Sequence, residues 1–385
     1  TGSTYTGGLF GSDMSTAEAT DSSNIVIGKD TVIKGDISTA GVVGKTWSGL
    51  TNCVSYANVV GSGNFTNGIA QTGGKSVFYS NCMNYGDVNG ADYVAGITST
   101  NSKPSGASEI KVENCYNLGN ISSTKETVNI GAISYMTANL FTVANSYNLG
   151  TVKDLSGDKA QFNANDTYTN VAYNSENGIA AAEGTTGITG YAAAQFKDRT
   201  VVDALNANDG VEETVWYQNT ENPDLAFNMT VTSDITVPEA LNVTLGKTMK
   251  LQASVTPEDA TNKTLVYTSS DDTIASVKED GTVSGLKLGT ADITVKAMDT
   301  GKEKTVKVTV KKVEKEPANP AKPSQPTTKT VKKGTKLIVG TNTFVVTNVK
   351  AKTVSYKATK NKKAAKITIP ATVKSGKQVY KVTTI

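Results

Sequence analysis

Few side chains in this sequence are suited to catalysis. Histidine is absent, and Arg199 is the single arginine. Without histidine the chain has no Ser-His-Asp triad, no Cys-His pair and no HExxH zinc motif. A single arginine also leaves phosphate chemistry and base-specific nucleic-acid recognition without their usual bidentate guanidinium contacts. Asp, Glu, Tyr and Lys remain, so glycosidase or lyase chemistry stays open.

The carboxylates do not form the pattern that glycosidase chemistry needs. Asp87, Asp92 and Glu113 are the candidates in the first half of the chain, and they do not recur in register with one another. Glycoside hydrolysis requires two carboxyl groups about 5 to 9 Å apart. We therefore expect no enzyme, no catalytic residue and no cofactor in this chain.

The three cysteines, Cys53, Cys82 and Cys115, occupy the same place in a repeated motif, and the fourth copy has Ser146 there. An odd, in-register set is not a disulfide framework. Stacked strands lie about 4.8 Å apart, which is compatible with a disulfide, so one bridge between neighbouring copies remains an alternative. A metal site needs more ligands than this column supplies. We favour cysteine as a small buried filler, with no metal.

The repeated motif predicts a stacked fold. Its four copies begin at Asn52, Asn81, Asn114 and Asn145, which are 29, 33 and 31 residues apart. Such a period is typical of stacked repeats. Each copy has a small residue in the sixth place, an apolar residue in the eighth and a second short apolar run, which predicts the coil of a β-solenoid. The four asparagines are expected to form a hydrogen-bonded ladder along the solenoid axis.

Aromatic side chains on the coils are the candidates for ligand binding. Tyr79, Tyr93, Tyr135 and Tyr147 are suited to stacking on sugar rings if they are exposed. The alternative is that these tyrosines belong to inner columns or pack between coils. We therefore predict that these four tyrosines form a glycan-binding site.

The sequence divides into five segments, and the predicted fold is all-β. Residues 1–190 are the solenoid, and 191–228 have apolar residues at helical spacing that predict a helical or hairpin cap over the open strand edges at its end. Residues 229–313 alternate as in an Ig-like β-sandwich. Residues 314–330 are a Pro/Lys linker, and 331–385 are a small Lys-rich β module.

Charge is concentrated in the last segment. Residues 331–385 contain thirteen lysines and no acidic residue, so the overall charge of +3 leaves −10 for residues 1–330. Such a module is expected to attract an anionic cell-wall polymer, such as teichoic acid or an acidic glycan, or else to be a solvated surface. Nucleic acid is not expected, because few aromatic residues lie between the lysines.

The ends of the sequence suggest a segment of a longer protein. No run of about twenty apolar residues is present, so no membrane span is expected. Thr1 begins no signal sequence, and an apolar alternation continues up to Ile385. We expect an extracellular segment, either secreted or on the bacterial cell surface.

Three stretches resemble known families. Residues 114–121, Asn-Cys-Tyr-Asn-Leu-Gly-Asn-Ile, followed by a Gly-Ala-Ile run, resemble the GLUG-type repeats of bacterial surface proteins. Residues 267–295 resemble the bacterial immunoglobulin-like group 2 domain, with Tyr267 where that family more often has tryptophan. Residues 367–373 resemble the first strand of surface leucine-rich repeats.

These resemblances imply a cell-surface protein of a Gram-positive bacterium. The expected function is a non-catalytic extracellular stalk or adhesin segment that presents its repeats to a host or microbial glycan or surface protein. The alternative is a secreted polysaccharide-active enzyme, or the non-catalytic portion of one.

Overall fold

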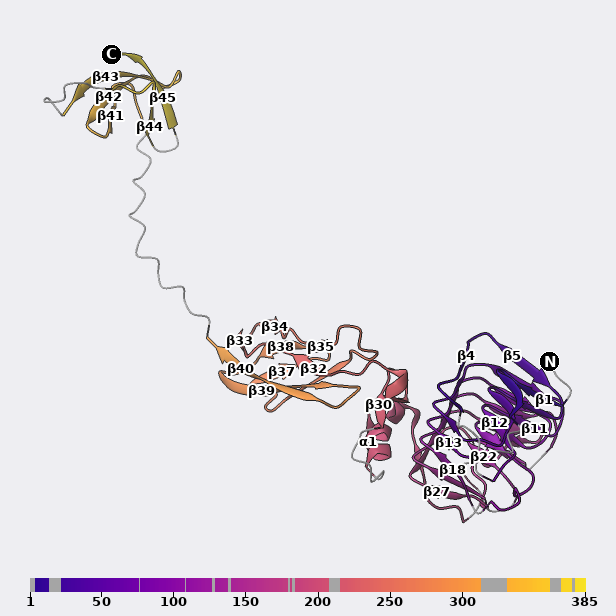
Figure 1. Ribbon diagram of the computed structural model, residues 1–385. Coiled ribbons are helices and arrows are strands. Elements are labelled where there is room, and N and C mark those ends of the chain that lie inside the picture. The colour runs from indigo at the N-terminus through magenta and orange to yellow at the C-terminus, as the bar shows by residue number, and fades with distance from the viewer. Residues whose placement is uncertain are drawn as a thin grey trace. The chain divides into compact units, whose positions relative to one another are not determined.

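The computed structural model describes residues 4–13, 22–75, 77–107, 109–126, 129–137, 140–178, 181, 184–207, 215–312, 331–360, 368–375 and 378–385. The chain forms two compact units, Thr1–Val313 and Glu314–Ile385. Short β-strands dominate both units, which confirms the predicted all-β fold (Figure 1). The predicted proline linker, residues 314–330, lies outside the described residues.

The first unit begins with the predicted β-solenoid. One coil consists of β8 (Leu50–Thr51), β9 (Val54–Ser55), β10 (Asn58–Gly61), β11 (Phe65–Asn67) and β12 (Ala70–Thr72). The first four of these strands pair in parallel with the matching strand of the next coil, as β9 does with β14 (Met83–Asn84), and β12 pairs in parallel with β7 (Val43–Thr46) of the preceding coil. Stacking therefore converts five very short strands per coil into long sheets that run along the solenoid axis (Figure 1).

The other strands of the solenoid fall into the same sheets. The β8 sheet also contains β3 (Ser22–Ser23), β13 (Tyr79–Ser80), β18 (Ile110–Glu113), β23 (Phe141–Ala144) and β27 (Thr167–Thr169). The β9 sheet, named the flank sheet below, also contains β4 (Val26–Ile27), β14 (Met83–Asn84), β19 (Tyr116–Asn117), β24 (Tyr147–Asn148), β28 (Val171–Asn174) and β29 (Ile188–Tyr191). The β10 sheet also contains β5 (Val32–Gly35), β15 (Val88–Gly90), β20 (Ile121–Ser123), β25 (Val152–Asp154) and β26 (Gly157–Asp158). The β11 sheet also contains β1 (Tyr5–Gly7), β6 (Ser38–Ala40), β16 (Val94–Ala95) and β21 (Ile130–Gly131). β12 pairs with β7 (Val43–Thr46), which pairs with β2 (Phe10–Asp13), while β17 (Thr98–Ser99) pairs with β22 (Ser134–Tyr135).

Asparagine turns the chain from the β8 sheet into the flank sheet in every coil. The residues at this corner have left-handed φ angles between 45° and 58°, a conformation that asparagine tolerates, and are Asn24, Asn52, Asn81, Asn114, Asn145 and Asn170. The Asn52 amide donates to Asn24 at 3.0 Å, and the Asn81 amide donates to Asn52 at 2.9 Å. The Asn170 amide donates to Asn145 in the same way, at 2.9 Å. The predicted ladder thus forms, but it is interrupted at Asn114, because the side-chain oxygens of Asn81 and Asn114 accept no hydrogen bond.

The cysteines fill the interior, as predicted. Cys53, Cys82 and Cys115 are free thiols with no exposed surface, stacked in one column of the core. The backbone N–H of Cys115 donates to Ser146 Oγ at 3.0 Å, so serine continues this column in the fourth copy. Burial is the main cause that raises the pKa of the Cys82 thiol well above its ordinary value. The thiol therefore stays protonated and unreactive.

A second asparagine ladder lies inside the solenoid at the opposite end of the flank-sheet strands, where β14, β19 and β24 end, and sequence reasoning missed it. The Asn84 amide donates to Asn117 at 2.7 Å, Asn117 to Asn148 at 2.8 Å, and Asn148 to Gln161 at 2.7 Å. The three asparagines have no exposed surface. Each amide also donates to a backbone carbonyl two residues ahead, as Asn117 does to Gly119 at 2.7 Å. This inner ladder supplies hydrogen bonds that water cannot reach.

The segment after the solenoid contains η1 (Ala193–Phe196), α1 (Thr200–Asn206), β30 (Trp216–Gln218), β31 (Pro223–Leu225) and η2 (Ala226–Asn228). The predicted cap would cover the end of the solenoid, but the described apolar side chains of this segment lie elsewhere. They pack instead against the outer side of the flank sheet, on Val54, Met83, Tyr116, Tyr147 and Ala172, one residue from each of successive coils. We name residues 192–228 the side cover.

The side cover is needed because the outward-facing residues of the flank sheet are apolar or aromatic. Cys115 points into the core, whereas its neighbour Tyr116 points outward and is equally buried. Trp216 and Phe196 pack on the outward tyrosines, with the Trp216 ring 5.5 Å and the Phe196 ring 5.7 Å from that of Tyr147. Asp224 anchors the β30–β31 hairpin, because it accepts a 2.8 Å hydrogen bond from the Tyr116 hydroxyl.

The Ig-like sandwich follows within the first unit, as predicted. One sheet consists of β33 (Ala240–Thr244), β40 (Glu303–Lys311), β39 (Gly289–Ala297) and β36 (Leu265–Ser269) in that order. The second consists of β34 (Thr248–Lys250), β38 (Thr282–Gly285) and β37 (Ala275–Val277), and β32 (Asp234–Thr236) pairs with β35 (Ser254–Thr256). Alternate residues of the long strands, such as Ile293, Val295 and Val308, form its core.

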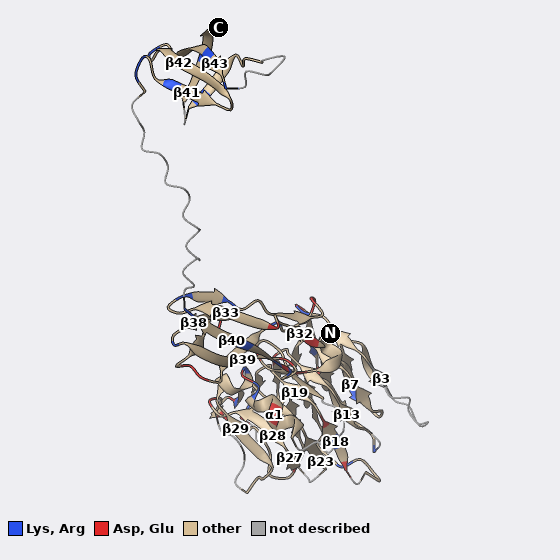
Figure 2. Cartoon of the chain, turned by 90° about the vertical axis from the view of Figure 1, so that its left-hand side faces the viewer, with Lys and Arg blue, Asp and Glu red and all other residues tan. Residues whose placement is uncertain are grey.

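The second unit contains one five-stranded sheet. Its order is β41 (Lys336–Val339), β42 (Asn342–Asn348), β43 (Thr353–Thr359), β45 (Gln378–Thr384) and β44 (Thr372–Ser375). A core of Leu337, Phe344, Val346, Val354, Val373 and Tyr380 lies on one face. Figure 2 shows lysines but no acidic residues on this unit.

Candidate ligand-binding surfaces

Three of the four predicted ligand-binding tyrosines are buried, which corrects their expected exposure. Tyr79 is 1% exposed, Tyr147 has no exposed surface, and Tyr135 is 8% exposed. The Tyr79 hydroxyl bonds to Thr98 at 2.9 Å inside the coil, and the Tyr147 hydroxyl donates to the carbonyl of Pro223 at 2.5 Å under the side cover. These side chains belong to inner and covered columns, the alternative considered for them.

Tyr93 is the predicted tyrosine that remains partly exposed. Its ring lies between Phe65, at a centroid distance of 5.2 Å, and Tyr135, at 6.3 Å. Its φ angle is 43°, and among the described residues it is the only aromatic one in the left-handed region. A large side chain in this conformation is strained, and such strain clusters at functional sites.

Polar groups suited to sugar hydroxyls lie beside Tyr93. Asp92 Oδ1 accepts a 3.0 Å hydrogen bond from the Tyr93 backbone N–H and a 2.8 Å bond from the Asn129 amide. Burial and the nearby Asp92 charge raise the pKa of the Tyr93 hydroxyl, so it stays protonated at neutral pH. We name Asp92, Tyr93 and Asn129 the Tyr93 corner.

Asp166 lies buried behind this region of the solenoid and accepts a 3.0 Å hydrogen bond from Ser134. Burial raises the pKa of its carboxyl from 3.8 to about 7, outweighing the lowering by its hydrogen bonds. The folded state therefore holds a proton that the unfolded chain releases, and stability falls as pH rises from the unfolded through the folded pKa. We expect a loss of about 2 kcal/mol in unfolding free energy between pH 5 and pH 7.

Urea unfolding at several pH values will check this expectation. Asp166→Asn should remove that part of the pH dependence, because its amide does not titrate. Asp87→Asn, at an exposed position, should keep the parental slope. A slope unchanged in Asp166→Asn would assign the pH dependence to other groups.

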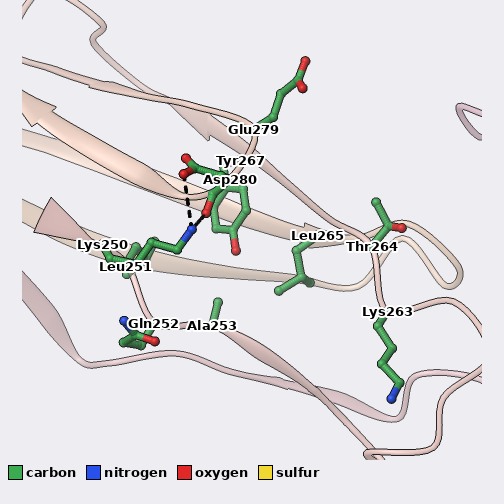
Figure 3. A pocket seen from close by; sticks show the side chains of 10 residues that line it. All are labelled: Lys250, Leu251, Gln252, Ala253, Lys263, Thr264, Leu265, Tyr267, Glu279 and Asp280. Carbon is green, nitrogen blue, oxygen red and sulfur yellow. Dashed lines mark hydrogen bonds and ion pairs between the residues drawn. The ribbon is translucent and has the colours of Figure 1, made fainter.

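The Ig-like sandwich carries an open groove of about 390 Å³ (Figure 3). Leu265 and Tyr267 of β36 form one side of it, and Gln252 and Ala253 lie opposite. Lys250 pairs with Asp280 at 3.5 Å at its rim. The groove arises because the segment between β34 and β35 leaves part of the inner face of β36 uncovered. Both side chains of this ion pair are exposed.

The candidate carboxylates lie at different places on the coil. Asp87 accepts a 2.8 Å hydrogen bond from the backbone of Asn120, before the β10 sheet. Asp92 lies at the next corner of the coil, and Glu113 ends β18 in another sheet. Within the described ranges, no group of three or more Cys, Asp or Glu side chains is placed to hold a metal ion.

Sequence reasoning also missed the polar network under the side cover. Asp224 accepts hydrogen bonds from the Asn219 amide at 3.1 Å and the Asn228 amide at 3.0 Å in addition to that from Tyr116. Burial raises the pKa of Asp224. The signal for it was weak, because Asp224 lies more than a hundred residues from Tyr116 in sequence. The inner ladder had a clear signal, since asparagine recurs in the fourth place of three motif copies, at Asn84, Asn117 and Asn148.

A β-solenoid followed by an Ig-like sandwich defines a protein built from a repeat module and an Ig-like module. Residues 230–308 match the bacterial Ig-like domain (group 2) family. This domain indicates a bacterial surface protein. None of the described helices is long and apolar enough to cross a membrane.

Similarity to curated proteins is confined to short stretches. A 3-O-alpha-D-galactosyl-alpha-L-arabinofuranosidase of Bifidobacterium longum subsp. longum is 45% identical over 67 residues, 17% of this chain and 6% of that enzyme. An alpha-L-arabinofuranosidase of the same subspecies is 48% identical over 61 residues, 16% of this chain and 6% of the enzyme. An Ig-like virion protein of Serratia phage KSP90 is 40% identical over 74 residues, 19% of this chain and 29% of that protein. The similarity to the glycosidases lies in Ig-like stretches, so it identifies a shared module.

Proposed function

We propose that this chain is a non-catalytic extracellular segment of a bacterial surface protein, whose solenoid presents a binding surface for a host or microbial glycan. The observation that supports this most directly is the Tyr93 corner. A strained, partly exposed aromatic ring beside a carboxylate and an amide is the combination that sugar binding uses. The Ig-like domain and the resemblance of the coils to GLUG-type repeats support the cell-surface setting.

The fold itself accounts for the motif residues. The motif asparagines form corners and ladders, and the cysteines fill the core. These residues therefore specify the stacking of coils, and ligand recognition is left to corner residues outside the motif, such as Tyr93. A binding surface that varies while the coil stays constant suits an adhesin.

Tyr93→Asn gives a sharp test of the proposal. Asparagine tolerates the left-handed conformation and adopts it at the corner before each flank strand from β4 to β28, so the variant removes the ring while relieving the backbone strain. We expect its unfolding free energy to stay within about 1 kcal/mol of the parent, and its affinity for glycans selected on an array to fall about tenfold or more. Tyr56→Ala, a half-buried tyrosine on the flank sheet side, is the matched control and should bind as the parent does.

The outcomes separate the alternatives. Equal binding by Tyr93→Asn and the parent would exclude the Tyr93 corner as the binding surface. A glycan array without a hit would contradict glycan presentation. The enzyme alternative predicts products from pectin, xylan or host glycans at high protein concentration, and we expect none.

A further inference from the structure

The outer face of the C-terminal sheet carries lysines on four of its five strands. Each of these lysines is next in sequence to a residue that packs in or against the core, so strand alternation points it to the other face. The lysines are Lys336 on β41, Lys357 on β43, Lys374 on β44 and Lys381 on β45. The register agrees, because Lys381 pairs with Thr353 and Thr372, while the neighbouring Tyr380 pairs with the core residue Val373. All four lysines are exposed. We name them the basic face.

The basic face differs from the lysine-bearing sheet of the Ig-like domain. There, lysines have carboxylate partners, as in Lys296–Glu303 at 3.4 Å, Lys304–Asp234 at 3.2 Å and Lys307–Asp292 at 3.2 Å. Residues 331–385 contain no acidic side chain at all. Like charges on adjacent strands repel one another, so an anion from another molecule would stabilise this sheet.

The arrangement fits an extended polymer better than a single small anion. The outermost strands β41 and β44 also contact each other, so the sheet curves and the basic face follows its outer surface across several strands about 4.8 Å apart. Ile338, 62% exposed, and Val379, 44% exposed, lie on the same face and offer contacts to an aliphatic backbone. A chain with repeated charges can meet several lysines at once, which one phosphate ion cannot.

The chemistry of the side chains favours phosphate groups. Lysine acts as a point charge that suits phosphate oxygens, whereas planar carboxylates are best recognised by the guanidinium fork, and residues 331–385 contain no arginine. Stacking of nucleobases needs exposed aromatic rings, but Phe344 and Tyr380 are buried in the core of this sheet, and the partly buried Tyr356 packs against that core. We propose that the basic face binds a linear poly(alditol phosphate) of the cell envelope.

Two quadruple variants of the full chain test the proposal. The first is K336Q/K357Q/K374Q/K381Q on the basic face. The second is K332Q/K333Q/K350Q/K352Q, which removes the same charge from exposed positions before β41 and between β42 and β43. The probe is poly(glycerol phosphate), with binding measured by biolayer interferometry at about 0.15 M salt.

We expect the basic-face variant to bind the probe about thirtyfold or more weakly and with a shallower salt dependence, and the control variant to stay within about threefold of the parent. Equal weakening of both variants would overturn the proposal, because it would show that net charge alone attracts the polymer. Tighter binding of polygalacturonate or single-stranded DNA would overturn the choice of phosphate polymer. Tyr93→Asn should bind poly(glycerol phosphate) as the parent does, so this test and that of the glycan surface can fail separately.

Discussion

Replacing Asn117 with alanine is expected to lower the free energy of unfolding by about 3 to 5 kcal/mol, the largest effect of a single substitution in the solenoid. Asn117 is fully buried in the middle of the inner ladder, where it accepts from Asn84 and donates to Asn148 and to the Gly119 carbonyl. Its removal leaves three buried polar groups without these partners. Each such group costs about 1 to 3 kcal/mol. Urea unfolding monitored by circular dichroism measures the loss.

Asn120→Ala is the matched control. Asn120 lies three residues further on in the same motif copy and also bonds to neighbouring coils, through Asp87 and Thr151, but it is exposed. Water replaces those hydrogen bonds, so we expect a loss below about 1 kcal/mol. A similar loss in both variants would show that the inner ladder contributes no more than surface bonds do.

Arg199→Ala is expected to destabilise the junction between the side cover and the Ig-like sandwich by about 3 kcal/mol. The Arg199 guanidinium donates to the backbone carbonyls of Met298, at 3.0 Å, and Asp299, at 2.6 Å, and it is 9% exposed. The Gln218 backbone N–H donates to the same Asp299 carbonyl at 3.0 Å. Loss of the guanidinium leaves two partly buried carbonyls with fewer donors.

The expected signature is a change in cooperativity. In calorimetry, the Ig-like sandwich of Arg199→Ala should unfold at a lower temperature than the solenoid does. Arg199→Lys should behave similarly, since an ammonium cannot reproduce the fork that spans two carbonyls. Lys197 lies two residues before Arg199 and forms an exposed ion pair with Glu221. Lys197→Ala removes this pair and should cause no measurable change in unfolding. Unfolding of Arg199→Ala identical to that of the parent would contradict the role of the junction.

The repeated sequence motif was sufficient to predict the solenoid, because each motif position has one structural role. Asn52 and its equivalents form the predicted corner ladder, and Cys53 and its equivalents form the predicted core column. The Ig-like strands were equally predictable, since β39 and β40 are long enough for alternation to identify their buried faces.

The exposure of the tyrosines was not predictable in the same way. Strands such as β13 and β24 are two residues long, so they contain no full period from which a face can be read. The position of the side cover, however, was within reach. Adjacent motif residues such as Cys115 and Tyr116 are both apolar or aromatic, and adjacent residues of a strand point to opposite faces. If Cys115 points into the core, Tyr116 points outward, and an apolar outer face requires a covering element.

The coils of the solenoid differ in length only at certain corners. The step from the flank sheet to the β10 sheet is the same in later coils, with Val54 and Val59 matched by Tyr116 and Ile121, but it is longer in the coil of β4 and β5, where Val26 and Ile33 match Val54 and Val59. Larger differences fall in the connections between other sheets, such as the one from β17, which ends at Ser99, to β18, which begins at Ile110. Insertions at these corners leave the register of every stacked column unchanged. The solenoid can therefore evolve, or be engineered, by grafting new loops onto a fixed frame without any redesign of its core.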